Sequence, residues 1–486
     1  MKKTLDVDFL RKLDERLEFI QQPLHARYPG DTSARQPVHV LYGGAHLFQA
    51  TTVRRLGDLA LRSVDEYAPD PVLFAKAIGL SGSTALSVGP RELANVAVPA
   101  SRSLAEGHPQ DALWLAQEIY QRVRNKLVQE PVEDLRIDFE DGYGIRPDAE
   151  EDGHAASAAQ QLAEAMSTGL GNLPPFIGIR IKPFGSRLRA RSIQTLDIFL
   201  TELATTANHK LPRNFCITLP KVTSPEEVAA LAEICFRLES DLMLLAGSLR
   251  IELMVESTQA VFNQRGEVNL LALVNAAAGR CVAVHFGPHD YSASRNLICN
   301  QPMTHFASDF AREVMQVALR GTGIRLADGP TNTLPIALHR AQKAAALSQR
   351  EVEENRAGMH QAWKMHFNHI TRSMESGFYQ GWDLHPAQLP IRYAAVYAFF
   401  LENLNQVSKR LQNFINAASR ATRVGQHFDD IAMAQGLMNY FSQAINCGAI
   451  SATEAQELSG LTIPELQSGS ASRVFEDRRD GIAGET

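Results

Sequence analysis

The stretch FCITLPKVTSPEEVAALAEICFRL, residues 215–238, contains a buried-strand pattern followed directly by a helix pattern. Its first residues are continuously apolar rather than alternating, which is typical of a parallel strand buried on both faces. The helix then begins with clear signals: Ser224 can cap it, Pro225 occupies the first helical position, and Glu227 completes a capping box. This stretch therefore predicts one β-strand/α-helix unit of an α/β fold.

The same unit recurs along most of the chain. The apolar runs that predict eight strands are HVLYGG (39–44), LRIDFED (135–141), FIGIRIKPF (176–184), FCITLPKV (215–222), RIELMVES (250–257), CVAVHFGPHD (281–290), IRLADGP (324–330) and GWDLHP (381–386). Eight alternations of strand and helix favour an α/β fold of the (β/α)₈ TIM-barrel type. A doubly wound open sheet is the structural alternative, but its Gly-rich nucleotide turn is missing after the first strand.

Three regions exceed a minimal barrel. We expect a barrel domain over residues 1–392, with helical insertions at about 51–130 (after the first strand) and 333–376. A helical extension should follow over 393–466, with an apolar stripe running from Leu389 to Leu411. Residues 467–486 are polar and are expected to form a disordered tail.

Composition limits the partners and the compartment. The 486 residues carry a formal net charge of −6, so there is no basic surplus for nucleic acid or for an anionic membrane surface. The five cysteines are scattered without a CxxC pair, which argues against a disulfide framework and a thiolate zinc site. No apolar stretch is long enough to span a bilayer. We therefore expect a reduced, soluble, cytoplasmic protein.

Polar residues collect at the ends of the predicted strands, where TIM barrels carry their active sites. These residues are Asp138, Glu140, Asp141, Arg180, Lys182, Lys221, Glu256, His285, His289, Asp290, Asp328, Asp383 and His385. Each has an ordinary structural alternative, such as a helix cap, a turn or an ion pair. Together, carboxylates with an arginine suit a hard divalent cation holding an anionic, oxygen-rich substrate.

The motifs also resemble a known family. DLRIDFEDGYG, IGIRIKPF, LPKVTSPEEV, LMVES, VHFGPHDYS and GFYQGWDLHPAQLPI are similar, in this order, to segments of the citrate lyase beta-subunit-like proteins of the HpcH/HpaI aldolase superfamily. They cover roughly residues 134–392, about half of the chain.

This resemblance implies a barrel that binds Mg²⁺ (or Mn²⁺) and makes or breaks a C–C bond beside a carboxylate-bearing carbonyl. It implies Glu256 and Asp290 as metal ligands and Arg180 as the group that holds the substrate carboxylate or oxyanion. Asp141 stands where the aldolase branch has a histidine base, so the base is left between Asp141 and another acid, with Glu140 as the neighbouring candidate. The segment AEEDGHAASAA, which replaces the family's lysine and Ala-Arg, weakens an assignment of coenzyme A.

These residues predict a lyase or aldolase acting on a small anionic 2-oxo acid, or on an acyl-CoA-type enolate. Arg180, Gly287 and Lys221 are the predicted substrate-binding residues, and Arg180, Asp141 and Glu140 the predicted catalytic ones. One alternative is phosphoryl transfer or hydrolysis on a phosphoenolpyruvate-like substrate, and another is a non-catalytic, oligomeric binding protein. We also predict a homo-oligomer, because the Leu389–Leu411 stripe exceeds what closing a barrel requires.

Overall fold

The structure is a computed structural model. It describes residues 4–30, 34–86, 112–169, 173–298, 302–341, 346–416, 422–424, 427–429, 431–474 and 477–478, with the backbone alone for 422–431.

Eight parallel strands close into one barrel in chain order, with β8 hydrogen-bonded to β1. The strands are β1 (His39–Gly44), β2 (Asp134–Asp138), β3 (Phe176–Arg180), β4 (Phe215–Leu219), β5 (Arg250–Val255), β6 (Cys281–Phe286), β7 (Arg325–Asp328) and β8 (Gln380–Asp383). Each lies within or beside one of the apolar runs, so the predicted TIM barrel and its eight strands are confirmed. Strands β2, β3 and β4 are buried along their whole length, although β2 alternates apolar residues with the charged Asp134, Arg136 and Asp138.

The register of the strands brings polar side chains to one height inside the barrel. Gly44 pairs with Asp138, Asp138 with Arg180, and Arg180 with Thr218. Because side chains alternate between the two faces of a strand, every second residue points into the barrel. The carboxyl ends of β2 and β3 therefore present Asp138 and Arg180 side by side.

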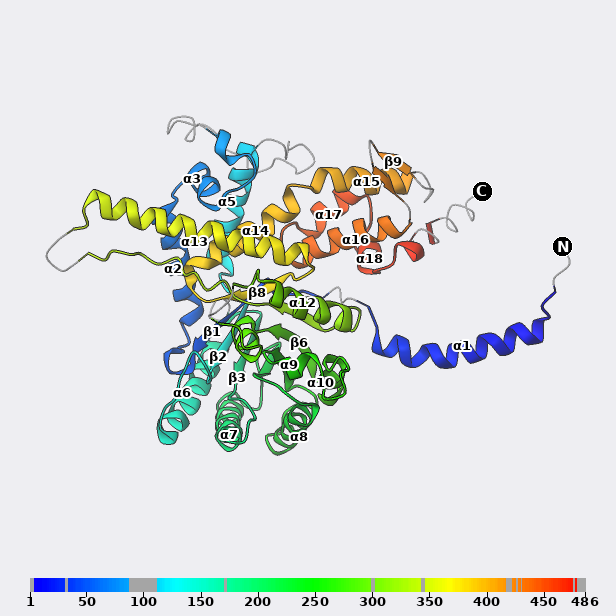
Figure 1. Cartoon of the computed structure of the whole chain (residues 1–486), viewed down its shortest axis with the longest axis horizontal. Coiled ribbons are helices and arrows are strands. Elements are labelled where there is room, and N and C mark those ends of the chain that lie inside the picture. Colours follow the sequence, from blue (N-terminus) through cyan, green and yellow to red (C-terminus); the bar gives the residue numbers. More distant parts are fainter. Residues whose placement is uncertain are drawn as a thin grey trace.

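Helices cover the outside of the barrel between the strands (Figure 1). They are α6 (Asp148–Ser167), α7 (Arg189–Thr206), α8 (Pro225–Asp241), α9 (Thr258–Val261), α10 (Leu270–Ala276), α11 (Pro288–Ser294) and α12 (Phe306–Leu319). Helix α8 has the predicted capping box, in which Ser224 and Glu227 each accept from the other's backbone N–H. Its apolar residues Val228, Leu231 and Cys235 are buried, as the helical spacing predicts.

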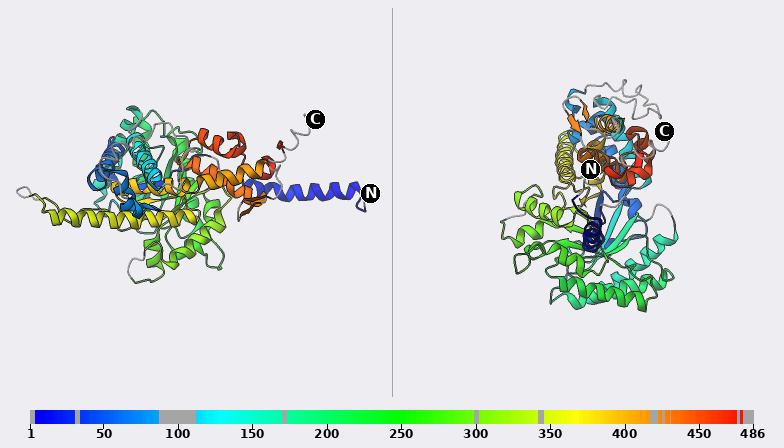
Figure 2. Two further views of the ribbon diagram at one scale, coloured as in Figure 1. Left: turned by 90° about the horizontal axis from the view of Figure 1, so that it is seen from above. Right: turned by 90° about the vertical axis from the view of Figure 1, so that its right-hand side faces the viewer.

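The segment after β1 contains α2 (Thr52–Tyr67), α3 (Pro71–Ile78) and α5 (Ala112–Gln129), with short 3₁₀ turns at Ala45–Leu47 and Ser83–Ala85. Residues 87–111 of the predicted insertion lie outside the described part of the chain. Before β8, the 27-residue helix α13 (Gln349–Glu375) runs along the molecule beside α14 (Figures 1 and 2).

The carboxyl-terminal region is helical but not one long helix. A 3₁₀ turn (Pro386–Gln388) leads into its helices, and a short antiparallel pair, β9 (Thr422–Val424) and β10 (His427–Asp429), interrupts them. The helices are α14 (Leu389–Leu401), α15 (Leu404–Asn416), α16 (Ile431–Asn446), α17 (Ala452–Ser459) and α18 (Ile463–Gln467). Half of the predicted tail, residues 475–476 and 479–486, lies outside the described residues.

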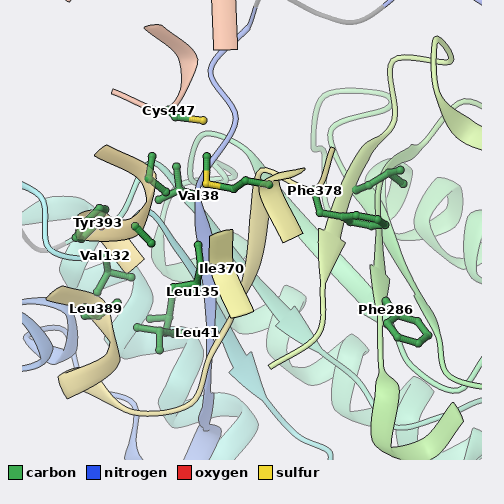
Figure 3. Close-up of a cluster of buried hydrophobic side chains, with 14 of the residues drawn as sticks. Val38, Leu41, Val132, Leu135, Phe286, Ile370, Phe378, Leu389, Tyr393 and Cys447 are labelled. Carbon is green, nitrogen blue, oxygen red and sulfur yellow. The ribbon is translucent and has the colours of Figure 1, made fainter. Parts of the chain in front are cut away.

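The predicted apolar stripe is covered by the same chain. Leu389, Val396, Phe400, Leu404 and Leu411 are all buried. Figure 3 shows the region where Leu389 and Tyr393 of α14 approach Val38, Leu41 and Leu135 at β1 and β2, with Cys447 nearby. The stripe therefore joins the helical extension to the barrel and gives no separate reason for self-association.

Helix α1 (Val7–Arg27) projects from the body and has no buried residue (Figures 1 and 2). In the described residues, no helix is long and apolar enough to cross a membrane. The four described cysteines are buried and free, as expected without a disulfide framework.

Candidate active site

The carboxyl end of β2 forms a tight turn around Asp138. Its two carboxylate oxygens accept hydrogen bonds from the backbone N–H groups of Glu140 (3.0 Å) and Gly142 (2.7 Å). A Cβ atom on residue 142 would lie 2.6 Å from Asp138 Oδ2, so only glycine permits this turn. The turn is therefore built by the DFEDG sequence itself, and it directs Glu140 and Asp141 toward the neighbouring strands.

Arg180, at the end of β3, is buried and held on several sides. Its Nε and Nη2 donate to the two oxygens of Asp138 at 2.6 and 2.5 Å. Its Nη1 lies 3.1 Å from Glu140 Oε2, and the guanidinium carbon lies 4.6 Å from the centre of the Tyr42 ring. The fork geometry with Asp138 fixes the guanidinium plane, so Nη1 points toward the carboxylates at the strand ends.

Lys221 connects four acidic residues at the ends of three strands. Its ammonium group bonds to Glu140, lies 3.1 Å from Asp141 Oδ1 and 3.6 Å from Asp290 Oδ2, while its backbone N–H donates to Glu256 at 2.8 Å. Its φ of +51° places it in the left-handed region, which non-glycine residues seldom adopt. Burial opposes the charge, but Glu140 and the other acids raise the pKa of Lys221 above its ordinary value.

Glu256 and Asp290 differ in their surroundings. Glu256 is 3% exposed, whereas the Asp290 side chain is 41% exposed. Burial raises the pKa of Glu256 to about 8; Arg180 opposes this shift, and the negative charge of Asp290 adds to it. A Cβ atom on residue 287 would lie 2.5 Å from Glu256 Oε1, so Gly287 makes room for that carboxylate.

Glu140 and Asp141 have opposite protonation tendencies. Burial raises the pKa of Glu140, and the positive charges of Arg180 and Lys221 only partly offset it. Burial also acts on Asp141, but the hydrogen bond with Glu140 and the two cations outweigh it and lower the pKa of Asp141. Asp141 is also 59% exposed. Glu140 is thus the group more suited to carry a proton.

A divalent cation would find two carboxylates here rather than a complete cage. Among the described residues, no group of three or more His, Cys, Asp or Glu side chains could hold a metal ion. Glu256 and Asp290 are close enough for one to shift the pKa of the other, and both offer hard oxygen donors. Mg²⁺ is commonly bound by one or two carboxylates, with water and substrate oxygens completing its shell. The donor set therefore fits Mg²⁺ or Mn²⁺ with the substrate as a further ligand.

Other predicted strand-end residues have structural partners. Lys182 pairs with Glu151 at 2.7 Å, and Asp328 pairs with Arg312 at 2.8 Å. Asp383 pairs with Arg392 at 2.8 Å. These ion pairs attach the barrel to its helices.

A charged layer lies below the site, and of its residues the sequence analysis singled out His285 but neither Arg136 nor Glu252. Arg136 and Glu252, both fully buried, pair at 2.6 Å, and Glu252 also lies 2.9 Å from His285 Nε2. The Tyr42 hydroxyl lies 3.1 Å from His285 Nδ1, so Tyr42 connects this layer to Arg180 above it. The signal was present in the two-residue alternation, which places Arg136 on the same face as Asp138 and Glu252 on the same face as Glu256.

One protein family matches most of the chain. The family described as "Domain of unknown function (DUF6986)" matches residues 17–474. The chain belongs to the DUF6986 family. No curated protein matches it.

Solved structures that resemble this DUF6986 chain include three kinds of protein. A citrate lyase from Burkholderia xenovorans LB400 has 19% identity and a TM-score of 0.49, covering 74% of this chain and 99% of that one. RipC from Yersinia pestis has 18% identity and a TM-score of 0.34, covering 55% and 89%. A Haloferax volcanii malate synthase has 13% identity and a TM-score of 0.41, covering 92% and 99%. A citrate lyase is thus among these structures.

Proposed function

We propose that this DUF6986 protein is a metal-dependent carbon–carbon lyase or aldolase that acts beside the enolate of a small 2-oxo acid. The observation that carries the proposal is the meeting of Glu256 and Asp290 with Arg180, Lys221 and Glu140 at the carboxyl ends of β2 to β6. This end of a (β/α)₈ barrel is where such enzymes place their catalytic groups.

The cations define the kind of substrate. Arg180 Nη1 and Lys221 Nζ both contact Glu140, so an anionic substrate entering here can replace Glu140 as the acceptor of their hydrogen bonds. Arginine and lysine donors suit the carboxylate and the developing oxyanion of a 2-oxo acid. Mg²⁺ or Mn²⁺ held by Glu256 and Asp290 would supply Lewis acidity that polarises a carbonyl group.

Glu140 is the group that we propose moves the proton. The C–C bond next to the enolate breaks when a hydroxyl on the departing carbon loses its proton, and that proton needs an acceptor. A carboxyl with a raised pKa is better matched to this task near neutral pH than one with a lowered pKa. The pKa directions therefore favour Glu140 as the base and Asp141 as an ionised partner of Lys221.

Glu140→Gln should reduce kcat by about 10²–10⁴-fold, because a positioned base contributes that much. In the wild type, kcat/KM should rise with pH through a pKa above the ordinary glutamate value, since only the ionised form accepts a proton. Glu140→Gln should lose this limb of the pH–rate profile. Asp141→Asn is the matched control and should retain the limb with a smaller loss of rate; the reverse ranking would identify Asp141 as the base.

We also propose that the protein self-associates, and α1 is the segment that supports this. Eight large apolar residues at its amino-terminal boundary or along it are exposed: Leu5, Val7, Phe9, Leu10, Leu17, Phe19, Ile20 and Leu24. So much apolar surface on one segment is typical of an interaction site. Light scattering at micromolar concentration should give an oligomer for the full chain and a smaller species once residues 1–27 are deleted. A full chain that is monomeric would refute the proposal.

A further inference from the structure

A cavity of about 830 Å³ lies at the opposite end of the barrel from the carboxylate cluster. Its wall includes the first residues of four neighbouring strands: Phe215 of β4, Arg250 of β5, Cys281 of β6 and Arg325 of β7. Because all eight strands are parallel, their first residues share one end and the candidate active site occupies the other. The cavity is thus a separate site.

Its described lining is rich in cations without carboxylate partners. Lys210, Arg250 and Arg325 all line it, and none of them forms an ion pair with an acidic residue in the described part of the chain. Arg250 Nη1 reaches only the carbonyl oxygen of Gly279, at 3.5 Å. Arg35 also lines the cavity, but Glu130 and Glu133 already neutralise it. No described lining residue is acidic, so three positive charges face the cavity unopposed.

Two buried polar atoms in the wall lack a hydrogen-bond partner: Ser248 Oγ and Arg325 Nε. Buried polar groups in folded proteins are nearly always paired, so two unpaired ones in the same wall are unusual. Arg280, near the same end of the barrel, shows the contrasting case. Its guanidinium donates to both oxygens of Glu239, at 2.6 and 2.9 Å, and so has a purely structural role.

The rest of the lining is apolar. Leu211, Leu245 and Ile324 provide hydrocarbon surface beside the cations. The volume lies within the range of about 300–1,000 Å³ that is usual for small-molecule sites. An inorganic ion would leave most of this surface uncovered, whereas an organic anion would use both kinds of lining.

We propose that this cavity binds an organic anion of nucleotide size, with two or more negative charges beside an aromatic or apolar group. Lys210, Arg250 and Arg325 hold the charged part. The apolar wall formed by Leu211, Leu245 and Ile324 holds the remainder.

Calorimetric titration of the full chain with ADP and with pyrophosphate tests this site. ADP carries charge and an aromatic base, while pyrophosphate carries charge alone. We expect ADP to bind more tightly than pyrophosphate, and the double variant Lys210→Gln/Arg250→Gln to weaken ADP binding at least tenfold. Both side chains are exposed, so the fold should tolerate the change. Arg356→Gln, an exposed charge on α13, is the matched control and should bind ADP as the wild type does.

Arg180→Ala changes the candidate active site at the other end of the barrel and therefore distinguishes the two sites. It should leave ADP binding unchanged. The proposal is overturned if neither probe binds, or if the double variant binds ADP like the wild type. It is also overturned if pyrophosphate binds as tightly as ADP, or if Arg180→Ala abolishes ADP binding.

Discussion

Arg180→Lys should lower kcat/KM by about 10²–10³-fold, although it keeps the positive charge. The loss follows from geometry: the guanidinium uses Nε and Nη2 to grip Asp138, which leaves Nη1 aimed at the site. A lysine ammonium cannot hold Asp138 with two parallel bonds and also present a donor in a fixed direction. Removing one oriented donor from a developing oxyanion has a cost of this size in other enzymes. Steady-state kinetics with a panel of aldol adducts of 2-oxo acids as substrates measures this fall in kcat/KM.

The matched control is Arg280→Lys, which breaks an arginine–carboxylate fork of the same kind far from the site. It should lower the melting temperature but leave kcat/KM nearly unchanged. If Arg180 acts on the substrate, Arg180→Lys should instead lower kcat/KM strongly and change the melting temperature little. A large fall in melting temperature with normal kinetics would show instead that the Asp138–Arg180 pair only holds β2 to β3.

Glu256→Gln should abolish metal-dependent turnover while leaving the fold intact. The amide is nearly isosteric, and it can still accept the backbone N–H of Lys221 that Glu256 Oε2 accepts. It cannot supply a negative charge to a divalent ion, and one of only two carboxylates is then missing. We expect the apparent metal affinity, measured by calorimetric titration, to fall by at least about 100-fold. Glu402→Gln is the control, since burial also raises the pKa of that carboxyl and it lies outside the site.

The metal-free protein offers a second measurement on the same variant. The pKa of Glu256 is raised to about 8, so its contribution to stability is present at low pH and is lost as pH rises through 8. Glu256→Gln has no such group to ionise. Its melting temperature relative to wild type should therefore be higher at pH 9 than at pH 6, by about 3 °C or more. If the difference in melting temperature between Glu256→Gln and wild type is the same at both pH values, then burial does not raise the pKa of Glu256.

The barrel could be predicted from the sequence because most of its strands are short, continuously apolar runs with clear helix signals between them. Part of the site could be predicted for the same reason: Arg180 ends a strand and Lys221 and Glu256 each follow one, so the topology places all three at the same end of the barrel. Tyr42 was not predicted as a site residue because an aromatic residue inside an apolar run usually belongs to the hydrophobic core. Its place under Arg180 depends on how β1 and β3 face each other across the barrel.

The contacts of Lys221 could not be predicted from the sequence. They require a left-handed backbone conformation at Lys221, and no pattern in the neighbouring sequence predicts it. The stripe from Leu389 to Leu411 illustrates another limit. Apolar spacing shows that a face is buried, but it does not show whether the cover is the same chain or a second one, and here it is the same chain. The strand register and the long-range packing determine both the contacts of Lys221 and what covers the apolar stripe.

Calorimetric titration with Mg²⁺ and with Mn²⁺, in the presence of a 2-oxo acid such as pyruvate or oxaloacetate, tests the central proposal most directly. Wild type and Glu402→Gln should bind one ion per chain with the same affinity, and that binding should weaken when the 2-oxo acid is omitted. Glu256→Gln should show no measurable binding under the same conditions. Equal metal affinity in wild type and Glu256→Gln would contradict the assignment of Glu256 and Asp290 as the metal site, and with it the proposed lyase chemistry.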